Sequence, residues 1–105
     1  VRPEWWKLAP MQPAGWQALD QLVQQRDRQC RGAVILGLNQ PLAALATSFA
    51  QACSPIVKGF MVGRSVWAEP SRQWLAGEID DAALVDAVAD NFTQLVLAWR
   101  KRASA

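Results

Sequence analysis

Histidine and tyrosine are both missing from this chain of 105 residues. A Ser-His-Asp triad, a Cys-His pair and most zinc sites therefore cannot be built from its side chains alone. The groups left for catalysis are lysine, arginine, the carboxylates and the backbone amides. We expect neither a bound metal nor a cofactor.

Cysteine is scarce, and long apolar runs are absent. Cys30 and Cys53 lack the spacing of metal ligands, and no stretch reaches the roughly 20 apolar residues that a membrane span needs. The first residues, Val1 to Glu4, lack the apolar core of a signal peptide. We therefore expect reduced thiols, a cytoplasmic location and no membrane contact.

The chain also lacks a strong excess of charge of either sign, because its formal net charge is only +2. Arg100, Lys101 and Arg102 stand together where a helix is expected to end, and positive charge there complements the helix dipole. This cluster does not require a nucleic-acid partner, and none is expected. Hydrophobic residues make up 51% of the chain, which is enough to fill the core of one folded domain.

Three short apolar runs alternate with segments of helical periodicity. Continuous hydrophobicity is typical of parallel strands that are covered on both faces. The predicted strands are 4–8, 33–38 and 56–63. The predicted helices are 16–29, a second that Asn39 caps with Pro41 in its first turn, a short one over 70–76 and a last one capped by Asp80.

This order predicts an α/β fold of three parallel strand–helix units. They correspond to the last part, strands six to eight, of a (β/α)₈ barrel, so residues 1–105 are expected to form a single partial domain. The short helix after the third strand supports this assignment, because such barrels often bind phosphate with the loops after strands seven and eight and an extra helix. Three strands alone leave two unpaired sheet edges.

A phosphate site is predicted where the third strand meets that short helix. Gly63 lets the backbone approach a ligand, Arg64 adds charged donors, and the amides near Ser65 point at an anion. Gly37, at the end of the preceding strand, is expected beside them. The alternative is that both glycines only permit sharp turns and that Arg64 is solvated.

Lys7 is the second candidate, because it lies near the carboxyl end of the first strand. A lysine desolvated there has a neutral amine that can attack a carbonyl and form a Schiff base. Alternatively, its ammonium group reaches solvent or a carboxylate such as Glu4. Lys58 lies early in its strand, away from the active face of a barrel, and we interpret it as structural.

Four runs of sequence together resemble one known family. They are RPEWWKL (2–8), the stretch from Arg31-Gly32 to Gly37-Leu38, VKGFMVGR (57–64) and WLAGEIDD (74–81). These runs are similar to the carboxy-terminal domain of bacterial 5-dehydro-2-deoxygluconokinase, a sugar kinase of myo-inositol catabolism. That domain in turn resembles class I aldolases of the tagatose-bisphosphate type, which are (β/α)₈ barrels with a Schiff-base lysine on strand six.

The resemblance implies roles for particular residues. Lys7 matches the Schiff-base lysine, and Gly63 and Arg64 match a phosphate-binding pair after strand eight. Gly37 stands near the strand-seven phosphate contact, where related aldolases often carry serine. The implied reaction cleaves 2-deoxy-5-keto-gluconate 6-phosphate into dihydroxyacetone phosphate and malonate semialdehyde.

The implied partners are this phosphorylated sugar acid, the rest of the barrel and the sugar-kinase domain. The kinase activity itself is not expected here, because no GxxxxGK[ST] run is present. A different hypothesis is a non-catalytic module that oligomerises or regulates the attached kinase. In either case, we expect the isolated chain to be inactive and to self-associate through its open sheet or strand edges.

Overall fold

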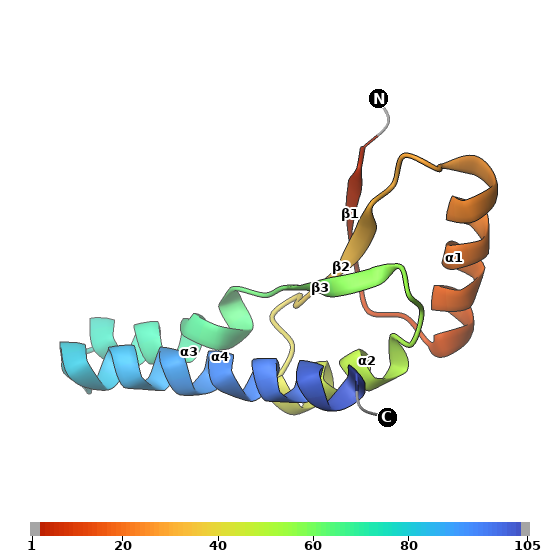
Figure 1. Ribbon diagram of the computed structural model, residues 1–105. Coiled ribbons are helices and arrows are strands. Elements are labelled where there is room, and N and C mark those ends of the chain that lie inside the picture. The colour runs from red at the N-terminus through yellow and green to blue at the C-terminus, as the bar shows by residue number, and fades with distance from the viewer. Residues whose placement is uncertain (1–2, 104–105) are drawn as a thin grey trace.

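The computed structural model describes residues 3–103 as strands and helices in alternation, followed by two consecutive helices (Figure 1). The strands are β1 (Trp5–Leu8), β2 (Gly32–Leu36) and β3 (Val57–Met61). The helices are α1 (Pro13–Arg26), α2 (Leu42–Gln51), α3 (Arg64–Leu75) and α4 (Asp81–Ala103).

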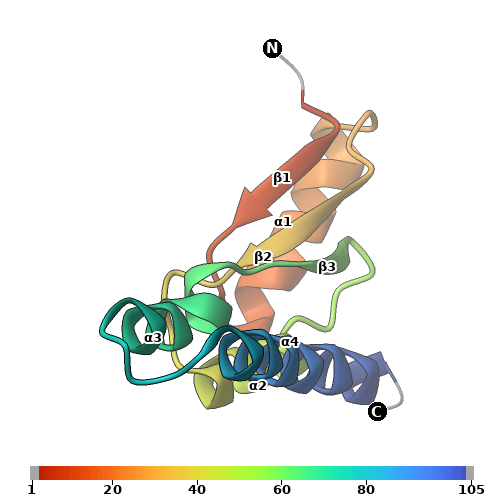
Figure 2. The ribbon, with the colours of Figure 1, turned by 90° about the vertical axis from the view of Figure 1, so that its left-hand side faces the viewer.

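The three strands form one parallel sheet in the order β1-β2-β3 (Figure 2). Lys7 pairs with Val34 on β2, and Leu36 pairs with Met61 on β3. The register shifts between Ala33 and Val34, so that β3 carries one extra residue there. These features confirm the predicted α/β fold of three parallel strand–helix units. The outer edges of β1 and β3 have no strand partner among residues 3–103.

The two faces of the sheet differ in burial. Ala33 and Ile35 of β2 are buried, because their face packs on the helices. The opposite face, which we call the open face, carries Lys7 on β1 and Met61 on β3, and both residues are exposed. The core therefore lies between the sheet and α1, α2 and α4. Its buried residues are Trp16, Ala33, Ile35, Leu45, Phe49, Ala52, Ile56, Val57, Val66 and Leu95.

Helix α3 begins at Arg64 and is longer than the helix predicted over 70–76. Pro70, expected at the start of the short helix, lies inside α3 instead. A proline has no N–H to donate to the carbonyl four residues earlier, which here belongs to Val66. Asn91 of α4 supplies the missing donor, since its Nδ2 lies 2.8 Å from the Val66 oxygen. The packing of α4 against α3 thus supplies the hydrogen-bond donor that Pro70 cannot provide inside α3.

Of the two residues predicted to cap helices, Asp80 does so and Asn39 does not. Asp80 caps α4, because its Oδ1 accepts a hydrogen bond from the Ala83 amide at 2.8 Å. Asn39 does not cap α2. Its backbone is left-handed, with a φ of 57°, and the helix begins after Pro41 without a side-chain cap.

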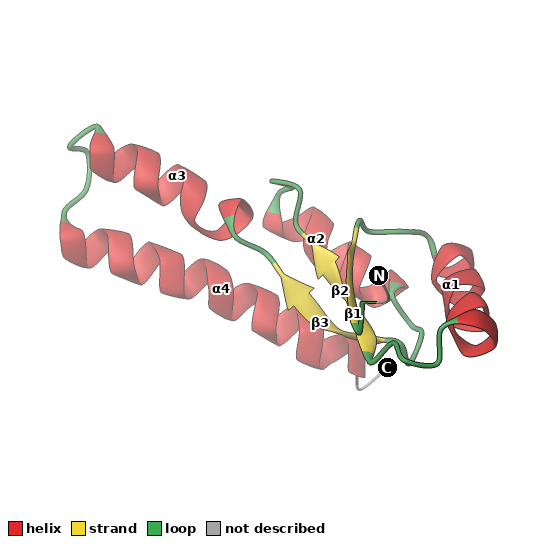
Figure 3. Ribbon diagram, turned by 90° about the horizontal axis from the view of Figure 1, so that it is seen from above, coloured by secondary structure: helices red, strands yellow, loops and turns green. Residues whose placement is uncertain are grey.

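The molecule is elongated. Its Cα radius of gyration is 16.0 Å, and its extents are 53 × 34 × 17 Å. A compact domain of this length is expected near about 13 Å. Figure 3 shows the reason: α3 and the amino-terminal half of α4 run side by side away from the sheet. We call this pair the α3–α4 hairpin. Within the described part of the chain, no helix is long and apolar enough to cross a membrane.

Candidate functional site

The carboxyl ends of β2 and β3 lie side by side and lead into two turns. After β2, the Gln40 amide donates to the Gly37 carbonyl at 3.0 Å, which closes a tight turn. The residues inside this turn, Leu38 and Asn39, both have positive φ angles, of 52° and 57°. After β3, the chain passes through Gly63 directly into α3.

Gly37 lies against the segment between β3 and α3, as the sequence predicts. A Cβ atom at Gly37 would lie 2.7 Å from Val62 Cγ1 and 3.4 Å from Ser65 Oγ. Only glycine leaves room for this approach, so Gly37 allows the first turn of α3 to sit beside the end of β2. Gly37, Gly63, Arg64 and Ser65 are therefore together at one edge of the sheet.

The start of α3 has the features of an anion-binding terminus. The Gly63 carbonyl accepts the amides of Val66 and Trp67, at 2.8 and 3.2 Å, but no side chain caps the helix. Its first turn carries no acidic residue, so the amide dipoles and the charge of Arg64 are not offset there. Arg64 is exposed and forms no ion pair with any of residues 3–103.

Two clefts meet at Met61 and Gly63. The first, of about 250 Å³, is lined by Leu36, Gly37, Leu38, Asn39, Met61, Gly63, Arg64 and Trp67. The second, of about 360 Å³, is lined by Lys7, Phe60, Met61, Val62, Gly63 and Phe92. Lys7 and Arg64 therefore line two neighbouring clefts. The sequence did not identify Leu38 and Met61 as cleft residues. Their positions at the ends of predicted strands were the signal that could have done so.

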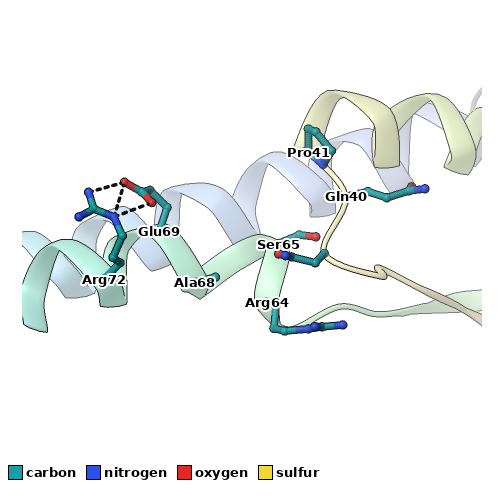
Figure 4. Close-up of a pocket in the computed structure, with 8 residues that line it drawn as sticks. Gln40, Pro41, Arg64, Ser65, Ala68, Glu69 and Arg72 are labelled. Carbon is teal, nitrogen blue, oxygen red and sulfur yellow. Dashed lines mark hydrogen bonds and ion pairs between the residues drawn. The ribbon is translucent and has the colours of Figure 1, made fainter.

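A third cleft, of about 420 Å³, opens between the loop after β2 and α3. It is lined by Asn39, Gln40, Pro41, Arg64, Ser65, Ala68, Glu69 and Arg72. In Figure 4, Arg64 points away from Arg72 and Glu69, and the Ser65 hydroxyl turns towards the loop. The Ser65 oxygen is buried and has no hydrogen-bond partner among the described residues.

The two arginines of this cleft differ in their partners. Arg72 donates from Nε and Nη2 to Glu69, at 2.8 to 3.1 Å, and its Nη2 lies 3.4 Å from Glu78 Oε2. The hydrogen bond from Arg72 lowers the pKa of Glu69, and the same bond raises the pKa of Arg72. Arg72 is thus committed to carboxylates, whereas Arg64 remains available to an anion.

Lys7 lies where the sequence places it, near the carboxyl end of β1, but it is exposed rather than desolvated. Glu4 does not pair with it, because Glu4 Oε2 binds Arg31 Nε at 2.6 Å. Lys58 occupies the register shift at the opposite end of β3, where its stem lies beside Gly32. Lys7, and not Lys58, therefore borders the clefts. No group of three or more cysteine or carboxylate side chains within residues 3–103 is placed to hold a metal ion.

The fold and this site define a class of protein: an open α/β unit of parallel strand–helix pairs with a cationic cleft at the carboxyl ends of its strands. The chain belongs to a bacterial family, described as an uncharacterized protein conserved in bacteria (DUF2090), whose profile matches residues 1–103. No curated protein and no solved structure matches the chain significantly.

Proposed function

We propose that this chain is the carboxy-terminal segment of a class I aldolase-like domain, in which β1, β2 and β3 serve as strands six to eight of a (β/α)₈ barrel. The proposed parent is the bifunctional inositol-catabolism protein that the sequence resembles. The observation that carries the proposal is that Lys7 and Arg64 line two neighbouring clefts, which have Met61 and Gly63 in common. A lysine nucleophile and an anion site are the two elements that such an aldolase needs.

In the proposed reaction, the amine of Lys7 attacks the ketone of 2-deoxy-5-keto-gluconate 6-phosphate and water leaves, which gives an iminium. Cleavage of the carbon–carbon bond sends its electron pair into that iminium and releases malonate semialdehyde. The resulting enamine takes a proton at carbon, which restores an iminium, and hydrolysis of this iminium by water releases dihydroxyacetone phosphate and frees the amine of Lys7. The group that removes the substrate hydroxyl proton would come from the preceding strands of the parent barrel, which would also cover the exposed Lys7.

The phosphate of the substrate would lie at the start of α3. There, the amides of Arg64 and Ser65 and the guanidinium of Arg64 provide donors. Gly37 would act indirectly, because it lets the end of β2 close against this turn. The anion would also bring a hydrogen-bonding group near the buried oxygen of Ser65, which has no partner now.

The test is borohydride reduction of the complete parent protein with dihydroxyacetone phosphate, followed by peptide mass mapping. We expect a stable adduct on Lys7. Arg64→Ala should raise the concentration of dihydroxyacetone phosphate needed for half-maximal labelling by about ten- to a hundredfold, since one charged hydrogen bond contributes about 1.5–3 kcal/mol. Lys58→Arg is the matched control and should label like the wild type. Labelling of Lys58, or cleavage of substrate without any labelled lysine, would contradict the assignment.

A non-catalytic role is the second candidate, and one observation favours it. Lys7 is exposed, and α4 carries large apolar side chains that are exposed as well. Both facts fit a module whose surface contacts another protein chain. Parent protein that neither forms an adduct nor cleaves substrate would favour this role.

A further inference from the structure

Helix α4 has two apolar faces, and within residues 3–103 the second is largely exposed, apart from the contact of Phe92 with Phe60. The first face packs on α2 and α3 and includes the buried Leu95. The second consists of Val85, Ala89, Phe92 and Val96, which we call the α4 seam. Val85 is 64% exposed and Phe92 is 48% exposed. Their spacing of four, three and four residues is the heptad pattern by which two helices pack together.

The charges along α4 are divided between its two ends. Asp81, Asp86 and Asp90 lie in its amino-terminal half, and the helix carries no basic residue before Arg100. Arg100, Lys101 and Arg102 occupy its last turn. A second α4 running antiparallel along the seam would set Asp86 of each helix near Arg100 of the other, because both residues lie on the same flank of the seam. Arg102 is held by carbonyls of α2, and Asp90 lies about 160° around the helix from Phe92. A parallel arrangement would bring like charges together.

We propose that the α4 seam is the interface of a homodimer in which the α4 helices of two copies pack antiparallel about a two-fold axis. Such an interface is self-complementary, so each apolar and charged contact occurs twice. Phe92 lies near the middle of the seam, close to the axis. The two helix dipoles are then also antiparallel, which is the favourable arrangement.

The open face of the sheet is the competing surface, and its charges oppose self-association. Lys7 and Lys58 are both exposed there, and the nearby Glu4 is paired with Arg31. Two copies packed face to face would therefore bring four lysine side chains together without a compensating carboxylate. The α4 seam has no charged member, and Asp86 and Arg100 flank it on one side. This inference does not rest on the proposed aldolase function.

The experiment is a dilution series of the chain studied by sedimentation and light scattering. We expect a monomer–dimer equilibrium that Phe92→Asp weakens at least about tenfold, as removal of a central aromatic anchor does. Leu97→Asp is the matched control. Leu97 is 57% exposed on the same helix but lies about 140° around it from Phe92, so its replacement should leave the equilibrium unchanged.

Phe92 also contacts Phe60, with ring centroids 6.0 Å apart, and its replacement could disturb folding. Val85→Asp avoids this difficulty, because Val85 lies in the α3–α4 hairpin beyond the sheet. It should also weaken the dimer, with an unchanged circular dichroism spectrum. A wild-type chain that stays monomeric at all concentrations would overturn the proposal. Trp5 lies beside Gly32 and Lys58 on the open face. A dimer that persists with Val85→Asp but dissociates with Trp5→Asp would also overturn the proposal, because it would use the open face.

Charge exchange tests the orientation. Asp86→Lys should weaken the dimer, and adding Arg100→Glu to it should restore part of the lost affinity, because the two positions meet across an antiparallel pair. A double variant weaker than either single variant would rule out the antiparallel arrangement.

Discussion

Gly37 illustrates how one residue without a side chain can determine the geometry of the proposed site. The space that its Cβ would fill belongs to a methyl group of Val62, at 2.7 Å. Gly37→Ala should therefore push the end of β2 away from the start of α3, and we expect a loss of about 1–3 kcal/mol in the free energy of unfolding, as for an overpacked core. Urea titration followed by tryptophan fluorescence measures it.

Gly59→Ala is the matched control for this change. Gly59 lies in β3, yet nothing lies within 4 Å of its Cβ position. This replacement should be neutral or should stabilise the chain by up to about 1 kcal/mol, since alanine has fewer unfolded conformations to lose. Equal losses for the two variants would mean that the contact with Val62 is not what matters.

Arg102 joins the last turn of α4 to the end of α2. Its Nε donates to the carbonyls of Phe49 and Ala52, both at 3.1 Å, and its Nη2 also donates to Ala52. The guanidinium lies 4.1 Å from the centre of the Trp99 ring. Helix α2 ends without a basic residue of its own, so Arg102 satisfies carbonyls that the helix leaves unpaired.

Arg102→Ala should cost about 1.5–3 kcal/mol of unfolding free energy, because hydrogen bonds from a charged donor are lost and α2 carbonyls remain unpaired. Arg102→Lys should recover only part of this loss, since an ammonium group lacks the planar fork and its stacking on the ring. Thermal unfolding followed by circular dichroism compares the three chains. A lysine variant as stable as the wild type would show that charge alone suffices.

At the scale of elements, the sequence predicted the strands, their order and the Asp80 cap, because these depend on local patterns. It failed at α3, where Pro70 suggested a helix start. The proline is tolerated inside the helix because Asn91, far away in sequence, donates to the Val66 carbonyl. The roles of Asn91 and Arg102 depend on tertiary contacts and leave no local signal. The grouping of Gly37 with Gly63, Arg64 and Ser65 was predictable, since parallel strands end at the same edge.

The whole molecule should remain extended in solution. Small-angle X-ray scattering of the Val85→Asp chain, expected to be monomeric, should give a radius of gyration near the 16.0 Å of the structure and above the roughly 13 Å of a compact domain. The α3–α4 hairpin accounts for this difference. A value close to 13 Å would show that the hairpin folds back onto the open face.

The order of the sheet has a consequence for how the chain folds during its synthesis. Because β1, β2 and β3 are adjacent in the order in which the ribosome produces them, each strand can pair with one that is already in place. No strand has to insert between two others, so the sheet can grow vectorially. The exception is α4, which follows all three strands in the chain and whose Arg102 reaches back to Phe49 and Ala52. The carbonyls at the end of α2 therefore gain this partner only after α4 has been synthesised.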